Sequence, residues 1–130
     1  MTSLRGLVYT RCVGYAPLAA LIGTRCYPDR IPENAVYPLV VYRAPIASTD
    51  AAYRTHGNGT DRTESTVQID CYATTGAGAE SLADAVAAAW NGYSLTCDIG
   101  YSFIANRIAN REDALNEYRS IVDVTIEHKR

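Results

Sequence analysis

The histidines and cysteines of this 130-residue chain are the first side chains to consider for chemistry. His56 and His128 are its only histidines, and neither lies in a recognisable catalytic signature with a serine, cysteine or carboxylate. The four cysteines are widely separated and show no CxxC or Cys/His ligand spacing, which argues against zinc. We therefore expect no catalytic residue and no metal ligand. The cysteines are Cys12, Cys26, Cys71 and Cys97.

A short turn with two glycines, Thr75-Gly76-Ala77-Gly78, lies between a predicted strand and a predicted helix. Backbone amides at a helix N-terminus can bind phosphate, so the turn resembles an anion site. However, no lysine follows it, and the third glycine of a dinucleotide fingerprint is missing. The start of a helix, with Thr74 or Thr75 as the N-cap, explains these residues more simply, and we expect no cofactor.

Acidic residues on two predicted strands offer a third possible chemistry. Asp70 lies on one strand, and Asp123 and Glu127 lie on the last one. Two carboxylates can cleave a glycosidic bond when they flank a cleft at a defined separation. A solvated or partner-facing sheet surface explains acidic residues at alternate positions more simply. We therefore expect a protein that is not an enzyme.

Length and charge exclude several classes of protein. A chain of 130 residues is long enough to bury roughly two-thirds of its unfolded surface, so we expect one domain over residues 1–130. The net charge of -2 comes from 12 basic and 14 acidic residues without a block of one sign, which argues against a dedicated nucleic-acid binder. Neither a secretory signal nor a membrane-spanning stretch is recognisable, so we expect synthesis in a reducing cytoplasm, where Cys71 is a small core residue.

Tyrosine and arginine are unusually prominent. The chain has 10 tyrosines but one tryptophan and one phenylalanine, and Lys129 is its only lysine. Both residue types are enriched at protein–protein interfaces, because each covers apolar surface and presents a polar tip. A GC-rich genome would also favour arginine over lysine, and that alternative stays open. The excess of tyrosine favours an interaction surface.

Proline and glycine divide the N-terminal part of the chain. Two short helices are expected between about residues 3 and 22, with a break near Gly14 to Pro17. Three prolines follow within a few residues of one another, so neither a helix nor a central strand can be continuous there. We expect an extended surface connection at Pro28, Pro32 and Pro38.

The remaining chain predicts strands at about residues 39–54, 63–74, 99–109 and 118–128, and one main helix at about 77–91. Within the second strand, apolar and polar residues alternate over residues 67–74, and the helix has one apolar stripe. We expect an α+β fold. It would have a single, mainly antiparallel sheet of about four strands with a long hairpin, and the main helix and short N-terminal helices on one face. The expected stripe is Leu82, Val86, Ala89 and Trp90, with the helix ending at Gly92.

The long hairpin is predicted from Asn58-Gly59, since both central residues of a type I′ turn need positive φ. Polar residues dominate from about 47 to 64, so we expect this hairpin to project beyond the core as an arm. A disordered loop is the alternative. The arm carries Tyr53, Arg54, His56 and Arg62.

The order and spacing of several segments resemble a known family. These are Tyr27-Pro28-Asp29-Arg30, the strand at 38–42, the strand at 67–73, the helical stretch 82–86 and the closing strand at 118–124. Together they resemble the tail-completion, or tail-terminator, proteins of long-tailed bacteriophages (siphoviruses). The resemblance implies a structural protein that forms a hexameric ring at the head-proximal end of the tail tube. Such a ring stops tail growth and joins the tail to the filled head.

The resemblance also implies partners and a location. The partners would be further copies of the chain, the tail tube protein and a head-side connector or stopper protein, and genomic DNA would pass through the lumen without specific binding. No membrane is involved, and the protein would be found in the tail or neck of the virion after assembly in the host bacterial cytoplasm. Candidate subunit-interface residues lie on the arm and on the polar strand face: Tyr53, Arg54, His56, Arg62, Asp70 and Tyr72.

Two other functions stay open. Another neck component, such as a head-completion or stopper ring, would share the interaction-rich composition and would bind the portal side. A small cytoplasmic enzyme or ligand-binding domain would instead show a deep pocket with convergent polar groups.

Overall fold

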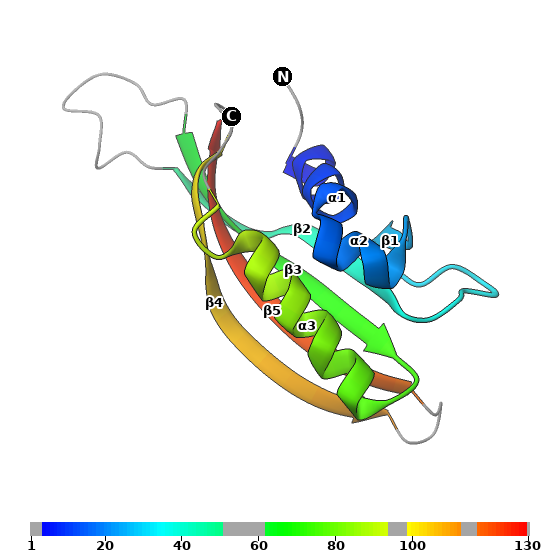
Figure 1. Ribbon diagram of the computed structural model, residues 1–130. Coiled ribbons are helices and arrows are strands. Elements are labelled where there is room, and N and C mark those ends of the chain that lie inside the picture. The colour runs from blue at the N-terminus through cyan, green and yellow to red at the C-terminus, as the bar shows by residue number, and fades with distance from the viewer. Residues whose placement is uncertain (1–3, 51–61, 94–98, 113–116, 130) are drawn as a thin grey trace, which may run out of the picture.

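The computed structural model of the chain describes residues 4–50, 62–93, 99–112 and 117–129 (Figure 1). Three helices and five strands follow one another in the order α1, α2, β1, β2, β3, α3, β4, β5. Their bounds are α1 Leu4–Gly14, α2 Ala16–Ile22, β1 Cys26–Pro28, β2 Leu39–Asp50, β3 Arg62–Ala73, α3 Gly76–Trp90, β4 Ile99–Glu112 and β5 Glu117–Lys129. No helix in these segments is both long and apolar enough to cross a bilayer.

The five strands form one sheet in the order β1-β2-β3-β5-β4. All neighbours are antiparallel except β1 and β2, which pair in parallel over three residues. The predicted α+β fold with a mainly antiparallel sheet is confirmed. The expected strand count of about four was one short, because residues 26–28, expected to be a surface connection, pair with residues 40–42 of β2.

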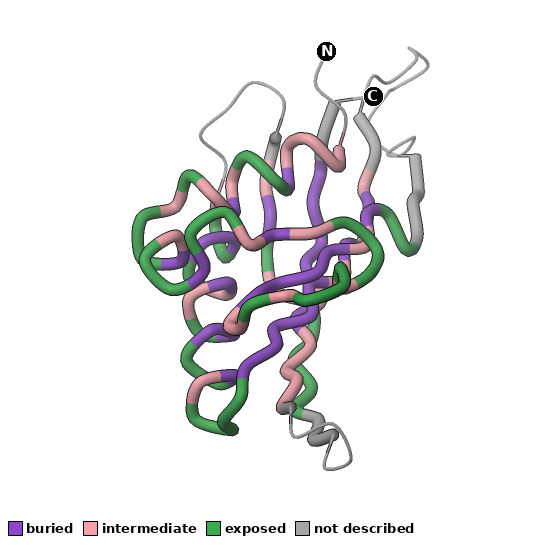
Figure 2. Tube along the Cα trace, turned by 90° about the vertical axis from the view of Figure 1, so that its right-hand side faces the viewer, coloured by how far each residue is buried: buried purple, intermediate pink, exposed green. Residues whose placement is uncertain are grey.

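All three helices cover the same face of the sheet, and β4 and β5 curve past α3 (Figure 1). We call the opposite side the helix-free face. The main core lies between the helices and the sheet, and the buried chain segments run through the middle of the molecule (Figure 2). As predicted, the α3 stripe is buried there, together with alternate residues of β3 and β5: Leu82, Val86, Ala89, Trp90, Val67, Ile69, Cys71, Val122, Val124 and Ile126.

Local sequence explains where the helices begin and end. α1 and α2 are separated at Tyr15, and Pro17 lies in the first turn of α2, where its missing N–H is not needed. Thr75 caps α3 by accepting a hydrogen bond from the Gly78 N–H at 3.0 Å. Gly92 follows α3 with a φ of 78°, as its position predicted.

The long hairpin is described only at its base. β2 and β3 pair as far as Asp50 and Thr63, whereas the Asn58-Gly59 tip lies outside the described residues. Residues 62–64 of β3 pair with β5 as well, so this part of the predicted arm belongs to the sheet. Projection of the arm beyond the sheet stays a prediction.

Candidate interaction surfaces

The turn before α3 serves to start the helix. A Cβ atom added at Gly78 would lie 2.9 Å from Thr75 Oγ1 and 3.2 Å from the Ala73 Cβ, so the capping contact needs a glycine here. The second glycine, Gly76, meets only the Tyr118 ring at ordinary contact distance. Thr75 thus acts as the N-cap, one of the two alternatives expected from the sequence.

The cysteines that the structure describes are core residues. Cys12, Cys26 and Cys71 are free thiols and buried in the main core, and burial raises the pKa of the Cys71 thiol well above its ordinary value. A protonated, inaccessible thiol is a poor nucleophile. Within the described segments, no group of three His, Cys, Asp or Glu residues is placed to hold a metal ion.

Asp70 is the centre of a polar cluster on the helix-free face. Its carboxylate is fully buried and accepts hydrogen bonds from Arg43 Nη1 at 2.5 Å and Gln68 Nε2 at 2.9 Å. The Nη1 atom of Arg119 lies 3.9 Å from the same carboxylate. The contact with Asp70 raises the pKa of Arg43, which fixes the positive charge beside the buried acid.

Asp123 lies at the margin of this cluster. It pairs with Gln68 across β3 and β5, and its Oδ1 atom is buried without a hydrogen-bond partner among the described residues. Burial, and secondarily the negative charge of Asp70, raise the pKa of the Asp123 carboxyl. The cluster therefore favours a protonated Asp123 more than water does.

Tyr72 is covered by the chain itself. With Leu39 and Val41 it forms a second, smaller core on the helix-free face. The segment between β1 and β2 packs over this core, and Asp70 beside it is buried as well. The face of β3 that we expected to be solvated or to meet a partner is therefore closed at both residues. The covering residues are Ile31, Ala35 and Tyr37 of this segment, together with Tyr27 of β1.

Apolar side chains are exposed on β4, which is the edge strand of the sheet. Phe103 is 43% exposed and stacks on Tyr101 with ring centroids 5.8 Å apart, and the Tyr101 hydroxyl donates to Glu64. Ile108, further along the same strand, is 49% exposed. Exposed aromatic and aliphatic side chains of this kind are typical of protein–protein contact surfaces.

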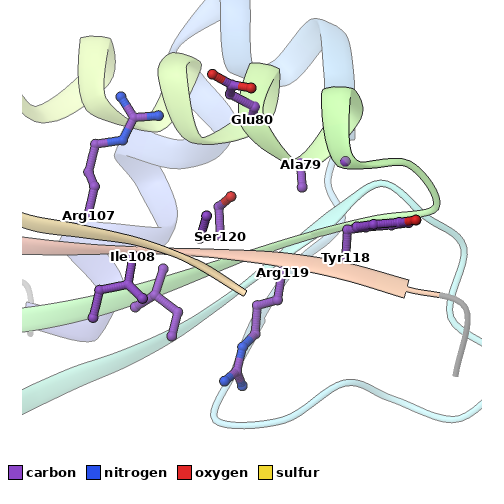
Figure 3. Close-up of a pocket in the computed structure, with 10 residues that line it drawn as sticks. Ala79, Glu80, Arg107, Ile108, Tyr118, Arg119 and Ser120 are labelled. Carbon is purple, nitrogen blue, oxygen red and sulfur yellow. The ribbon is translucent and has the colours of Figure 1, made fainter. Parts of the chain in front are cut away.

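A groove of about 600 Å³ lies beside β4. Its α3 side carries Glu80 and Ala79, and Arg107 and Tyr118 project from the sheet on that same side, whereas Ile108 and Arg119 project from the opposite face (Figure 3). Arg107 also forms an exposed ion pair with Asp84 of α3 at 2.9 Å. The groove is open to solvent at the sheet edge, whereas a typical small-molecule pocket encloses most of its ligand.

Comparison with known proteins decides the family. The family model described as "Tail completion protein gp17" matches residues 6–126. The chain belongs to this tail completion protein family. It is a structural protein of the phage tail and not an enzyme.

The fold of this tail completion protein is also found in a solved virion structure. A chain of the "Virion of native gene transfer agent (GTA) particle" is similar with a TM-score of 0.74 and 22% sequence identity, covering 95% of this chain and 92% of that chain. At that identity the likeness shows a shared fold. No curated protein sequence matches the chain.

The candidate interface residues of the tail completion protein fall into two groups. Asp70 and Tyr72 are described and are buried within the chain. Three of the arm residues, Tyr53, Arg54 and His56, lie outside the described part of the structure. The fourth, Arg62, begins β3, but its side chain is not described either. Their role in subunit contacts stays a prediction.

Two residues that sequence reasoning did not single out are Phe103 and Ile108. Both lie in the predicted strand at 99–109, and each is an apolar residue on the face away from the helices. The available signal in the sequence was that Phe103 is the only phenylalanine of the chain.

Proposed function

We propose that this tail completion protein forms a ring at the head-proximal end of the tail tube, ends tail growth and joins the tail to the head. The match of the family model over residues 6–126 carries this proposal. The ring would be hexameric, as the resemblance implies. Each subunit would then need a heterologous contact that closes by rotation, plus two faces for the tail tube and the head-side connector.

The surfaces of the chain suit such a role. Exposed apolar side chains on β4 and an open groove beside α3 provide contact area in a small chain. The projecting hairpin arm at about residues 47–64, with Tyr53, Arg54, His56 and Arg62, would reach a neighbouring subunit or the adjoining ring. Deletion of residues 55–61 should leave a folded chain that does not assemble.

DNA would pass through the lumen without specific binding. A net charge of -2 with scattered basic residues gives no concentrated phosphate site, and a strongly basic lumen would hold DNA with salt-dependent affinity.

Electron microscopy of a producing lysate in which this gene is switched off tests the proposal. Filled heads beside unattached, often overlong tails are the expected result. Heads that have lost their DNA would move the assignment to a head-side ring, and normally joined particles would reject both assignments.

A further inference from the structure

The chain itself occupies several backbone groups on the outer edge of β4. The Gly92 N–H, just after α3, donates to the Ser102 carbonyl at 2.9 Å, and the Asn91 Oδ1 atom accepts from the Ile104 N–H. At a bulge, Asn106 Oδ1 accepts from the Arg107 N–H at 2.9 Å. These contacts block pairing with another strand at residues 102–106.

The second half of β4 is open. In an antiparallel strand every second residue directs its N–H and C=O away from the paired neighbour. Because the Arg107 N–H points outward, the same holds for Ala109 and Arg111. In the described part of the chain, the outward backbone groups of Ala109 have no partner, and the groove beside α3 lies next to them. We call residues 107–111 the open edge; the Arg107 N–H within it is already bonded to Asn106 Oδ1, so the outward groups of Ala109 and Arg111 are the ones offered to another strand.

Among the described residues, a second edge without a paired strand lies on β2 at the other side of the sheet. β1 covers only residues 40–42, and Arg5 Nη1 donates to the Ala44 carbonyl at 3.3 Å. Beyond the bulge between Arg43 and Ala47, the pairing of Ala47 with Thr66 leaves residues 46, 48 and 50 directed outward. Ile46 there is 48% exposed.

We propose that residues 46–50 of a second copy add to the open edge as an antiparallel strand; this inference rests on the proposed ring. Ser48 then lies opposite Ala109, so that small residues meet beside the groove. Asp50 takes the position opposite Arg107, which pairs opposite charges across the contact. The alternation also keeps the helices of both copies on the same side of a continuous sheet.

Pairing of β4 with β4 of another copy fits the residues less well. With Ala109 at the two-fold axis, Arg107 of one copy would lie opposite Arg111 of the other. Like charges directly opposite each other on neighbouring strands are destabilising. Charge thus favours the heterologous contact between β4 and β2.

The register makes this contact compatible with a closed ring. Within one copy, Ser48 of β2 pairs with Ser65 of β3. At the other side of the sheet, Ala109 of β4 pairs with Ser120 of β5, which in turn pairs with Cys71 of β3. Cys71 lies six residues beyond Ser65 along β3. Each copy is therefore shifted along the strand direction by roughly 20 Å relative to its neighbour, which is the length of six strand residues. Across the strands, the four strands that each copy contributes span roughly 19 Å. The strands then tilt by about 45° from the ring axis, close to the tilt of closed barrels.

The direction of the displacement decides which face lines the lumen. Viewed from the helix side with β3 pointing up, β4 lies to the right of β3 (Figure 1). Because the next copy is added at the upper end of β4, the strands of the ring would be tilted from the ring axis and would rise to the right in that view. If the helices lie on the outside of the ring, this tilt has the right-handed sense that the twist of natural sheets favours. The helix-free face would then line the lumen.

Cysteine cross-linking in assembled particles tests the strand pairing. In this experiment the double variant Ser48→Cys/Ala109→Cys replaces the natural chain in the lysate. After mild oxidation it should give a series of covalent multimers, because paired residues of neighbouring strands are close enough to form a disulfide. The single variants Ser48→Cys and Ala109→Cys should give none. A dimer from Ala109→Cys alone would indicate β4 paired with β4, and particles without such multimers would also overturn the inference.

A backbone variant tests the open edge independently. Ala109→Pro removes the outward N–H without removing a hydrogen bond to β5, so the chain should fold and fail to form rings. Asn106→Ala, the matched control, keeps the Ala109 N–H and should assemble. Rings formed by a folded Ala109→Pro variant would contradict the strand pairing and leave the proposed function standing, whereas normal particles without this gene would contradict the proposed function itself.

Discussion

Arg43 and Asp70 are diagonal neighbours on β2 and β3, and their side chains meet at 2.5 Å on the helix-free face. The carboxylate is fully buried, whereas the guanidinium side chain is 37% exposed. The buried acid therefore depends on a partner that stays in contact with water, and on Gln68 for its second oxygen. Asp70 thus holds together β2, β3 and, through the more distant Arg119, β5.

Replacing Asp70 with asparagine should lower the free energy of unfolding by about 1–3 kcal/mol, because the charged hydrogen bonds of a buried carboxylate are lost. Urea denaturation followed by circular dichroism measures the change. Asp29→Asn, which removes the exposed ion pair with Arg5, is the control and should leave the urea midpoint almost unchanged. Equal losses in the two variants would contradict the special role of the buried pair.

Asp123 should make stability depend on pH. Its pKa is raised in the folded state, so the native chain binds this proton more tightly than the unfolded chain does. Its contribution to stability is therefore present at low pH and is lost as pH rises from the ordinary aspartate pKa through the raised value. Asp123→Asn should be more stable than the natural chain at neutral pH, and the difference should vanish on acidification below about pH 4. A difference that does not change with pH would count against this account.

Gly78 and Gly76 form a matched pair at the start of α3. Gly78→Ala places a Cβ 2.9 Å from Thr75 Oγ1 and should disturb the cap, lowering stability by about 1 kcal/mol. Gly76→Ala meets only the Tyr118 ring, at 3.6 Å, and should be neutral or stabilising by less than about 1 kcal/mol. Thermal melts of both variants distinguish the effects, and a Gly78→Ala melt equal to that of Gly76→Ala would show that the cap does not matter.

Arg11 joins α1 to the end of α3. Its Nε donates to the Ala89 carbonyl at 2.8 Å, and its guanidinium carbon lies 4.7 Å from the Tyr15 ring centroid and 3.8 Å from that of Tyr93. Lysine keeps the charge but not the planar stack, so Arg11→Lys should lower the free energy of unfolding by about 1 kcal/mol. Tyr93→Phe retains the ring and should have little effect. Unchanged stability of Arg11→Lys would mean that stacking contributes nothing here.

The arginine–tyrosine composition pointed toward an interaction surface, and the structure uses part of it in contacts within the chain. Arg11 is enclosed by two tyrosines, and Arg5 lies over the Tyr42 ring. Amino-acid composition shows how many amphipathic side chains a chain has. It does not show whether their partners belong to the same chain, because those contacts join segments that are far apart in the sequence.

Elements with a clear period could be predicted from the sequence. The alternation of apolar and polar residues in β3 and β5 and the apolar stripe on α3 each predict which face of the element is buried, because that face packs in the main core. β1 could not be predicted, since three residues carry no period and their strand is fixed by pairing with residues 40–42. The burial of Tyr72 was missed for a related reason: alternation separates two faces of a strand, but it does not show that the segment before β2 folds back over the second face.

The contacts that Asn91, Gly92 and Asn106 make with the outer edge of β4 have a consequence for the fate of excess protein. A long, uncovered edge strand is a template on which chains stack in many slipped registers and grow into fibrils. Here the Ser102 carbonyl and the N–H groups of Ile104 and Arg107 already have partners, so slipped pairings that use these groups are disfavoured. A protein made in large amounts before its partners are ready would stay out of aggregates by this means.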